Sequence, residues 1–542
     1  MPKRKHTFKT YWAATKNTAR NSAGILAALI FSLPPFPAQA QQLNLDGVLA
    51  ARKAALASLH VHGVSTIEVF GAMGGGDIIG SFHRWQSAGN VREDDEIASH
   101  SVRTLRLGDR EYVINESGDV RELRGVLARH QRGQDFVADG EFVSAPQYDT
   151  FKGKQTLEDG RSTYAIEVNP PQAQPETVYL DDRSFMIDRV SYEEDDGIAT
   201  EDYYDYGVFH GALIPSREVD SNGDREYDVT HYTRHVVVGG RIDPSVFTLP
   251  PSTAIQTDKP VTVPVRESLG HLYTQVHVGT KDYTFLIDTG AQMIALDSHV
   301  AAEQHIPYQG HLEVAGAKRV GGLGFAPLPS IEIGSAVLPV HSVSVLDLRG
   351  ATGGADGVLG YPFFASAEVT IDPLSRSMTL GKPGTLVAQG TEFDIDNDRQ
   401  LVEMHGTVNR VDGTFVVDTG NSTEVLLYSP FMEAHPYVVP LEDRQHPVSD
   451  FGVGGSARAA FAYIDELEFG PFHFYNRYAS IMMSDRGAFA DRFDAGNIGM
   501  GVLKNFVLTF DEANARIYVE KSAAFDDGRD RRRTEDPGVM FR

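Results

Sequence analysis

The sequence predicts a mainly β protein, in which an export signal precedes a curved antiparallel sheet domain with one or two helices and then two similar β lobes. Three observations support this fold class. β-Branched and aromatic residues alternate between turn-forming clusters through residues 61–238. A Pro-rich linker follows at residues 249–260. Beyond it, a set of short landmarks occurs twice, with an offset of 130 residues or slightly more.

Residues 1–40 have the pattern of an export signal peptide. Six Lys/Arg and no acidic residue precede the apolar run Ala23–Leu33, and the segment ends on Ala38-Gln39-Ala40. Small residues at these positions suit a signal peptidase, so we expect cleavage before Gln41 and a periplasmic or secreted protein. The apolar run is shorter than the roughly 20 residues that a transmembrane helix needs. An uncleaved anchor is the alternative.

The composition excludes several kinds of partner and chemistry. The formal net charge is −25, and it falls to −31 without the six cations of residues 1–40. Because like charges repel, neither nucleic acid nor an anionic membrane is expected as a partner. The chain has no Cys, which excludes disulfides, a lipid-modified N-terminal cysteine and thiolate catalysis.

Residues 42–248 are expected to form the sheet domain. Helices are predicted at residues 43–60, where Ala and Leu are dense, and near residues 126–134. Strands are predicted where β-branched and aromatic residues alternate, at residues 162–168, 177–180, 185–192 and 227–238. No convincing catalytic constellation lies in this part of the chain.

The sheet domain resembles the periplasmic lipoprotein-carrier (LolA-like) domains in its strand pattern, from PETVYLDDRSFMIDRVSYEEDDG to IDPSVFTLP. The resemblance covers about 200 residues and has no diagnostic motif. In that family one face of the sheet holds acyl chains. The resemblance therefore implies a binding or positioning domain, with an acyl chain or lipid as its expected ligand.

After the linker, the chain repeats itself in two lobes, at residues 261–385 and 390–521. Asp288-Thr289-Gly290 returns as Asp418-Thr419-Gly420, and each triplet follows three bulky apolar residues. A buried strand is therefore expected to end at each Asp, and Gly permits a tight turn that aims backbone N–H groups back at the carboxylate. Three further pairs of landmarks recur in the same order: Gly321-Gly322 and Gly454-Gly455, Ile331–Gly334 and Leu467–Gly470, and Asp356–Asp372 and Ala495–Asp511.

These repeats resemble the retropepsin-like and pepsin-like aspartic peptidases, in which two Asp-Thr-Gly loops meet about a twofold axis. The resemblance implies two β-barrel lobes that form one pseudo-twofold site, with Asp288 and Asp418 as the catalytic pair of an endopeptidase. It also implies an extended polypeptide as substrate and no cofactor. Thr289 and Thr419 would brace the loops, and Gly290 and Gly420 would donate N–H groups to the carboxylates. Since one chain supplies both halves, a monomer suffices.

Gly-rich segments at Val320–Gly324 and Gly452–Gly455 are the flap candidates, with Gly321, Gly322, Gly454 and Gly455 as the residues that let a backbone close over substrate. A plain hairpin turn is the alternative for both segments. The segments Gly357–Gly360 and Gly496–Gly499 are expected to begin strands that shield the two Asp turns.

Two departures from the family pattern bear on activity. Ala291 and Asn421 follow the triplets, where pepsin-like enzymes favour Ser or Thr. Without a hydroxyl donor the pair should be less acidic, so we expect activity at mildly acidic pH. Asn497 also replaces the apolar Val358 in the second shielding strand, which predicts a looser second lobe. A non-catalytic peptide- or lipid-binding protein on a pseudo-peptidase scaffold is therefore the alternative function.

Other candidate motifs are weaker. Asp394–Asp398 begins like a calcium loop, but Arg399 stands where that loop needs Gly and His405 where it needs Glu, so a solvated turn is expected. The nineteen His show no His-Glu-x-x-His pattern, and no metal site is predicted. Residues 524–542, dense in Asp and Arg, are predicted to be a disordered tail.

Overall fold

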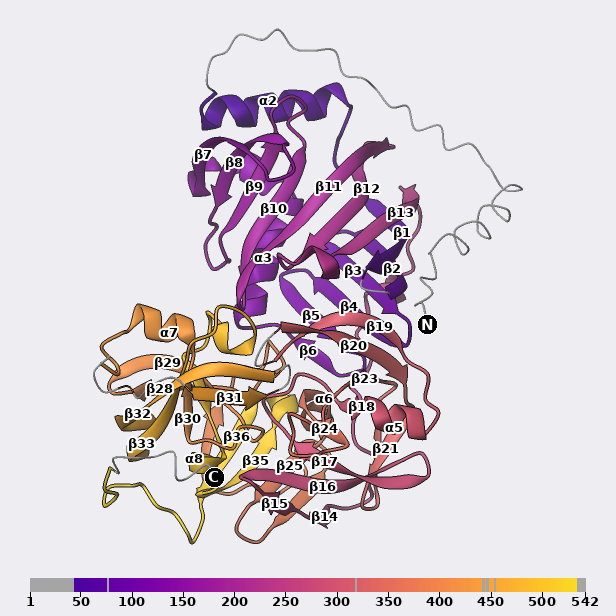
Figure 1. Ribbon diagram of the computed structural model, residues 1–542. Coiled ribbons are helices and arrows are strands. Elements are labelled where there is room, and N and C mark those ends of the chain that lie inside the picture. The colour runs from indigo at the N-terminus through magenta and orange to yellow at the C-terminus, as the bar shows by residue number, and fades with distance from the viewer. Residues whose placement is uncertain are drawn as a thin grey trace, which may run out of the picture. The chain divides into compact units, whose positions relative to one another are not determined.

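The computed structural model describes residues 43–75, 78–316, 319–440, 444, 448–452 and 455–533 (Figure 1). The predicted export signal lies outside these residues. Strands dominate what is described, which confirms the mainly β fold class. Throughout the same ranges, no helix is both long enough and apolar enough to cross a membrane.

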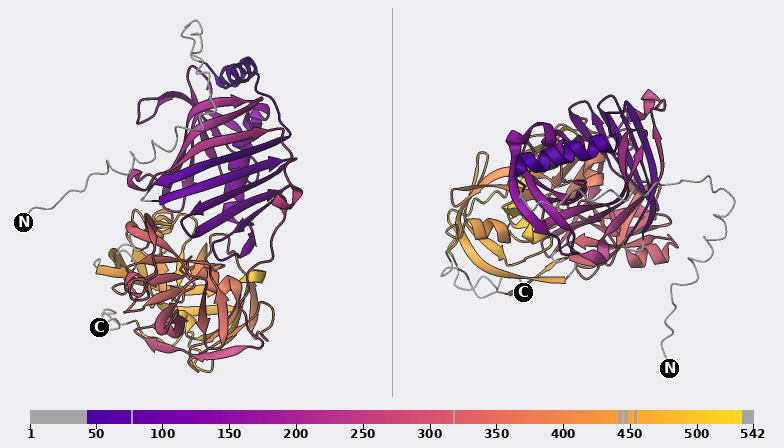
Figure 2. Two further views of the ribbon diagram at one scale, coloured as in Figure 1. Left: turned by 90° about the vertical axis from the view of Figure 1, so that its right-hand side faces the viewer. Right: turned by 90° about the horizontal axis from the view of Figure 1, so that it is seen from above.

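Thirteen antiparallel strands from the N-terminal half form one sheet, in the order β6-β5-β4-β3-β2-β1-β13-β12-β11-β10-β9-β8-β7. Neighbours in the sheet are neighbours in sequence except where β1 pairs β13, which joins the two ends of the domain. Figure 2 shows the sheet strongly curved, as predicted. The strands are β1 (Thr66–Gly75), β2 (Ile78–Ser87), β3 (Asn90–Ile97), β4 (His100–Leu107), β5 (Arg110–Ile114), β6 (Val120–Glu122), β7 (Asp149–Thr156), β8 (Ser162–Val168), β9 (Glu176–Asp181), β10 (Ile187–Glu194), β11 (Gly197–Phe209), β12 (Ala212–Ser221) and β13 (Val229–Val238).

Three helices cover part of this sheet: α2 (Leu45–Ser58), α3 (Val126–Ala138) and α4 (Glu141–Ser144). Both predicted helices are therefore present, with α3 extending beyond its expected end. Their apolar side chains meet those of β8, β9 and β10 in one core, which includes Val48, Phe142, Ile166 and Leu180. Burial of each such side chain contributes roughly 1.5–3 kcal/mol, so the core fixes the helices on this face.

The first lobe contributes most of its strands to one sheet, in the order β19-β20-β23-β18-β24-β17-β16-β21-β22, with β15 paired to β16. Short helices α5 (Ser298–Glu303) and α6 (Tyr361–Ser366) follow β18 and β24. The strands are β15 (Arg266–Ser268), β16 (His271–Val278), β17 (Lys281–Ile287), β18 (Ala295–Asp297), β19 (Gln309–Ala315), β20 (Arg319–Pro327), β21 (Ser330–Ile333), β22 (Ala336–Pro339), β23 (Ser342–Leu346) and β24 (Gly357–Leu359).

The second lobe closes into a six-strand ring, because β28 pairs both β29 and β32 at the two ends of the series β28-β29-β34-β30-β33-β32. The hairpin strand β31 extends this sheet, and the short helices α7 (Ser429–Ala434) and α8 (Met500–Leu503) follow β30 and β34. The strands are β28 (Glu403–Val408), β29 (Val411–Val417), β30 (Val425–Leu427), β31 (Val448–Gly452), β32 (Gly455–Phe469), β33 (Phe472–Met482) and β34 (Gly496–Ile498).

Proline explains why the lobes differ in strand length. The second lobe has one long hairpin, β32–β33, where the first lobe has four shorter strands, β20 to β23. The first-lobe breaks fall at Pro327, Pro329 and Pro339, and Pro cannot donate a ladder hydrogen bond.

A six-stranded sheet joins the lobes, in the order β14-β26-β25-β35-β36-β27, and β25 of the first lobe pairs β35 of the second. Phe364 and Phe510 pack edge to face beneath it, with ring centroids 5.2 Å apart. One apolar core runs through both lobes and this sheet. The strands are β14 (Val261–Pro264), β25 (Glu368–Asp372), β26 (Ser377–Gly381), β27 (Thr391–Asp394), β35 (Phe506–Asp511) and β36 (Arg516–Lys521).

Two predicted connecting segments carry defined contacts. In the predicted linker, Ile255 is buried and its N–H donates to Ser366 O at 2.8 Å. Residues 524–533, assigned from sequence to a disordered tail, instead pack on the second lobe: Phe525 contacts the core and Arg531 pairs with Glu424 at 2.5 Å. Aromatic burial and a charge-assisted hydrogen bond offset the entropy of ordering this short stretch.

Candidate active site

Asp288 and Asp418 occupy the same position in their lobes. Each directly follows a buried strand, β17 or β29, that pairs in parallel with β24 or β34. The Asp288 N–H donates to Leu359 O and the Asp418 N–H to Ile498 O, both at 3.0 Å. The shielding strands predicted from Gly357 and Gly496 are thus present as β24 and β34, and they fix where each carboxylate emerges.

The two Asp loops are interlocked by their threonines. Thr419 Oγ1 donates to Ile287 O at 2.9 Å and accepts the Thr289 N–H at 3.1 Å. In the reciprocal pair, Thr289 Oγ1 donates to Val417 O at 2.5 Å and accepts the Thr419 N–H at 3.0 Å. Both threonine side chains are almost fully buried. Each hydroxyl therefore satisfies two backbone groups, both of them across the lobe boundary, and the loops have one relative position.

The glycines of the triplets allow the close approach of the two carboxyl groups. Gly290 N donates to Asp288 Oδ1 and Gly420 N to Asp418 Oδ1, both at 2.9 Å. A Cβ at Gly420 would lie 2.2 Å from Asp288 Oδ1, and one at Gly290 would lie 2.6 Å from Asp418 Cγ. Any side chain at either position would therefore displace the opposite carboxylate.

The carboxyl groups of Asp288 and Asp418 each lie against the glycine of the opposite loop, which makes them close neighbours. Burial raises the pKa of both carboxyl groups, and the charge of whichever group ionises first raises the pKa of the other. Because two adjacent carboxylates cannot both ionise cheaply, the pair holds one shared proton at mildly acidic pH.

A series of hydrogen bonds through two side-chain amides ends at Asp418, and the described part of the first lobe has no equivalent series. Thr423 N donates to Asn421 Oδ1 at 2.8 Å, Asn421 Nδ2 donates to Asn497 Oδ1 at 2.6 Å, and Asn497 Nδ2 donates to Asp418 Oδ2 at 2.8 Å. The prediction that Asn497 loosens the second lobe is wrong: it is 3% exposed and both ends of its amide are paired.

The predicted flaps are hairpins, but the glycines are distributed differently than expected. In the first lobe β19 and β20 form the hairpin, and Gly321 and Gly322 lie within its second strand, β20. The ladder there has an irregular register, and Gly322 has φ +120°, which favours Gly. In the second lobe Gly455 begins β32 and pairs with Gly452, while Gly454 lies outside the described residues.

The hairpin β19–β20 contacts both the second lobe and the N-terminal sheet. Ala488 of the second lobe donates its N–H to Gly316 O, near the hairpin turn, at 3.0 Å. Asn222 of the N-terminal sheet donates to Glu313 at 2.8 Å. The His100 ring stacks on Phe325, with centroids 4.1 Å apart, and burial lowers the pKa of His100 to about 4.

A buried cation lies beside the Asp loops. Arg399 is 4% exposed and pairs with Glu403, Asp491 and Asp494, and its carbonyl oxygen accepts from Gln292 Nε2 at 2.6 Å. Gln292 is two residues beyond Gly290, so this cluster contacts the first Asp loop directly.

The expected solvated turn at Asp394–Asp398 differs from the structure. Asp398 is 2% exposed, and its carboxylate accepts the N–H groups of Arg124 and Ala128 at 2.7 and 3.4 Å and that of Gly125. It therefore caps the start of α3. The unsatisfied N–H groups of a helix N-terminus are the physical reason a carboxylate is buried there.

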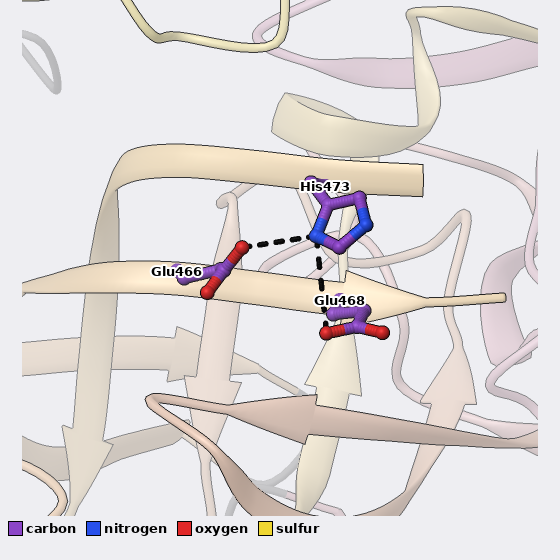
Figure 3. Close-up of side chains that lie close together, drawn as sticks. All are labelled: Glu466, Glu468 and His473. Carbon is purple, nitrogen blue, oxygen red and sulfur yellow. Dashed lines mark hydrogen bonds and ion pairs between the residues drawn. The ribbon is translucent and has the colours of Figure 1, made fainter. Parts of the chain in front are cut away.

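One group in the described part of the chain combines His and carboxylate ligands of the kind that bind divalent cations. Figure 3 shows His473 of β33 beside Glu466 and Glu468 of β32, with His473 Nδ1 2.9 Å from Glu466 Oε1 and 3.8 Å from Glu468 Oε2. All three are partly exposed and already pair with one another across the strands. Such pairs need no cation, and the group adds nothing to the chemistry of the Asp pair.

The face of the N-terminal sheet that bears α3 is rich in carboxylates beyond the apolar core. Residues directly opposite on paired strands share a face, and Glu201 lies opposite the core residue Val190. Following the register across β12 and β13 to β2 and β3 places five acids and two basic side chains on it: Glu93, Asp95, Glu201, Glu218 and Asp220 with Arg84 and His231. We call this surface the acidic face.

Comparison with known proteins supports the assignment of the peptidase-like part. A family model described as aspartyl protease matches residues 274–363, which include Asp288, Gly321 and Gly322. This region is therefore aspartyl protease-like. No protein among the curated ones matches the sequence.

Three of the solved structures that match are similar to this chain at low sequence identity. A putative outer membrane lipoprotein-sorting protein domain from Vibrio parahaemolyticus is 7% identical over 37% of this chain and 95% of its own, with a TM-score of 0.26. A DUF1329 family protein from Desulfovibrio piger is 12% identical over 37% and 97%, with a TM-score of 0.27. A LolA superfamily protein from Nitrosomonas europaea is 14% identical over 36% and 97%, with a TM-score of 0.26.

Proposed function

We propose that the protein is an exported aspartic endopeptidase, which hydrolyses peptide bonds with water activated between Asp288 and Asp418. The observation that carries this proposal is the pair of interlocked Asp-Thr-Gly loops with their carboxyl groups as close neighbours. Two unrelated turn aspartates would not be expected to share reciprocal hydrogen bonds through buried threonines.

The chemistry follows from the shared proton. The ionised carboxylate takes a proton from a water molecule, and the water oxygen bonds to the peptide carbonyl carbon. At the same time the protonated carboxyl gives its proton to the carbonyl oxygen, which yields a tetrahedral diol. In the collapse of the diol the nitrogen takes a proton from the carboxyl that had accepted it from water, one diol hydroxyl gives its proton to the other carboxylate, and the C–N bond breaks. The enzyme forms no covalent intermediate.

The substrate class is an extended polypeptide. The hairpins β19–β20 and β31–β32 supply strand backbone, which pairs with an extended chain through main-chain hydrogen bonds. Both Asp loops come from one chain, so a monomer suffices. The pattern of residues 1–40 supports export to the periplasm or the medium.

The alternative is a non-catalytic periplasmic protein that binds peptide or lipid on a pseudo-peptidase scaffold. The acidic face argues against lipid binding, because burying carboxylates against an acyl chain is costly. Burial already raises the pKa of Glu218 to about 8 and that of Asp95 to about 7. At neutral pH and below these two carboxyl groups are largely protonated, but they remain polar, so this face favours a polar ligand over an acyl chain.

The test uses purified residues 41–542 and an unfolded protein substrate from about pH 3 to about pH 7. We expect cleavage that a statine-type inhibitor blocks and that Asp288→Asn abolishes. Inhibitor-insensitive cleavage, or an Asp288→Asn protein as active as the wild type, would contradict the proposal. Absence of cleavage with retained peptide binding would favour the binding protein.

A further inference from the structure

The two aspartates of the pair have similar backbone donors but different side-chain donors. Gly290 and Gly420 each donate an N–H to the carboxylate of their own loop at 2.9 Å, and Asn421 N also donates to Asp418 Oδ1 at 3.0 Å. Beyond these backbone bonds, Asp418 alone accepts a side-chain amide, that of Asn497. Val358, which pairs with Leu286 as Asn497 pairs with Val416, has no donor.

The direction of the Asn497 amide is fixed by its neighbours. The backbone N–H and the hydroxyl of Thr423 both donate to Asn421 Oδ1, at 2.8 and 2.7 Å. Asn421 Nδ2 must therefore point at Asn497 Oδ1, and Asn497 Nδ2 must point at Asp418 Oδ2. A backbone N–H thus sets the orientation of two amides in series, and the last of them is a donor aimed at the carboxylate.

A hydrogen bond to the charged form of a carboxyl group favours that form. Asp418 Oδ1 accepts two N–H groups and Oδ2 accepts the amide, so three of its four lone pairs are occupied by donors. We propose that Asn497, oriented by Asn421, is a positioning residue that keeps Asp418 ionised and places the shared proton on Asp288, so that Asp418 is the general base and Asp288 the general acid. This inference rests on the proposed function.

Asn421 stands where pepsin-like enzymes favour Ser or Thr, and its amide has a role of its own. It orients the amide of Asn497, which then donates to Asp418. Other ionisable groups also face the pair or lie behind it: His271 at Gly420, Tyr428 near Asp418, Glu424 beyond Thr423, and Asp491, Asp494 and Arg399 behind Tyr428. These groups are the same in the wild type and in the variants compared below, so their effects on the pH profile cancel when two profiles are compared.

The first test is the pH profile of kcat/KM. Asn497→Val gives the second lobe the side chain of the first, and we expect the acid limb to move up by about one pH unit, a tenfold change in the ionisation equilibrium. Val358→Asn gives Asp288 a matching donor and should move the basic limb down. The double exchange should restore both limbs, with the roles of the aspartates swapped. An Asn497→Val profile with unmoved limbs would overturn the proposal.

The second test does not depend on peptidase activity. The donor stabilises an ionised carboxylate, so the loss of Tm in Asn497→Val should be larger near pH 7 than near pH 3. A loss of Tm that is equal at both pH values would show a purely structural role and overturn the proposal. If no inhibitor-sensitive cleavage is found at all, the proposed function fails while this stability comparison still decides the role of Asn497.

Discussion

Thr419→Val tests the contact on which the joint site depends. The side chain is 0% exposed, and its hydroxyl serves Ile287 O at 2.9 Å and the Thr289 N–H at 3.1 Å. Val has nearly the same shape, so no cavity forms, but two buried backbone groups lose this partner. At about 1–3 kcal/mol for each unsatisfied group, the free energy of unfolding should fall by roughly 2–6 kcal/mol.

The matched control is Thr419→Ser, which keeps the hydroxyl and loses one methyl group at a cost of about 1 kcal/mol. Urea unfolding followed by far-ultraviolet circular dichroism measures the difference. Trp85 is the only Trp in the sequence after residue 40 and lies in β2, so its fluorescence reports on the N-terminal sheet and not on the lobes.

The double variant Thr289→Val/Thr419→Val should lose less than the sum of the two single variants, because the four bonds form one reciprocal set. A coupling of about 0.5 kcal/mol or more is expected. If Thr419→Val is as stable as Thr419→Ser, or if the two Val substitutions are additive, the threonines do not act as an interlock and the reasoning is refuted.

Three further outcomes follow from the charges and the close contacts of the site. Asp288→Asn should be more stable than the wild type, by a margin that grows from about pH 4 to pH 7. Burial raises the pKa of Asp288 in the folded protein above its value in the unfolded chain, so the wild type loses stability as the pH rises and the Asn variant does not. A margin in Tm that stays constant across this pH range would contradict the reasoning. Arg399→Met should cost about 3–5 kcal/mol near pH 7, because it leaves buried carboxylates unpaired, and less at pH 4, where they protonate; equal losses in urea unfolding at the two pH values would contradict this. Gly420→Ala should lower kcat at least tenfold while the protein still folds, because its Cβ overlaps Asp288 Oδ1; a kcat equal to that of the wild type would mean that the carboxylates are not this close.

The Asp loops could be predicted from sequence because their determinants are local. A triplet after three apolar residues specifies a strand, a turn and a carboxylate at its tip, and the repeat supplies the partner. The interlock follows once the two copies face one another. The helices α2 and α3 could also be predicted from sequence, since their apolar side chains are spaced for burial.

The role of Asn497 could not be predicted, because its hydrogen-bond partner is set by tertiary structure. The sequence shows only an Asn where the other lobe has Val358. Whether that Asn loosens a strand or serves a carboxylate depends on the parallel pairing of β29 and β34, which brings it beside Asp418. Asp398 was misjudged for a similar reason, because the helix that it caps is more than 250 residues away in sequence.

The position of the hairpin turn was also beyond the sequence signal. Adjacent glycines at Gly321 and Gly322 are typical of a turn, yet here they accommodate an irregular register within β20. β19 ends at Ala315 and β20 begins at Arg319, so both glycines lie inside a strand.

The most direct measurement of the central claim is an active-site titration with a tight-binding statine-type inhibitor, followed by calorimetry and by loss of activity. The account predicts one inhibitor per chain, activity proportional to protein concentration, and loss of binding in both Asp288→Asn and Asp418→Asn. Two inhibitors per chain, activity that rises with the square of concentration, or binding that survives either substitution would contradict a single site built from both lobes of one chain.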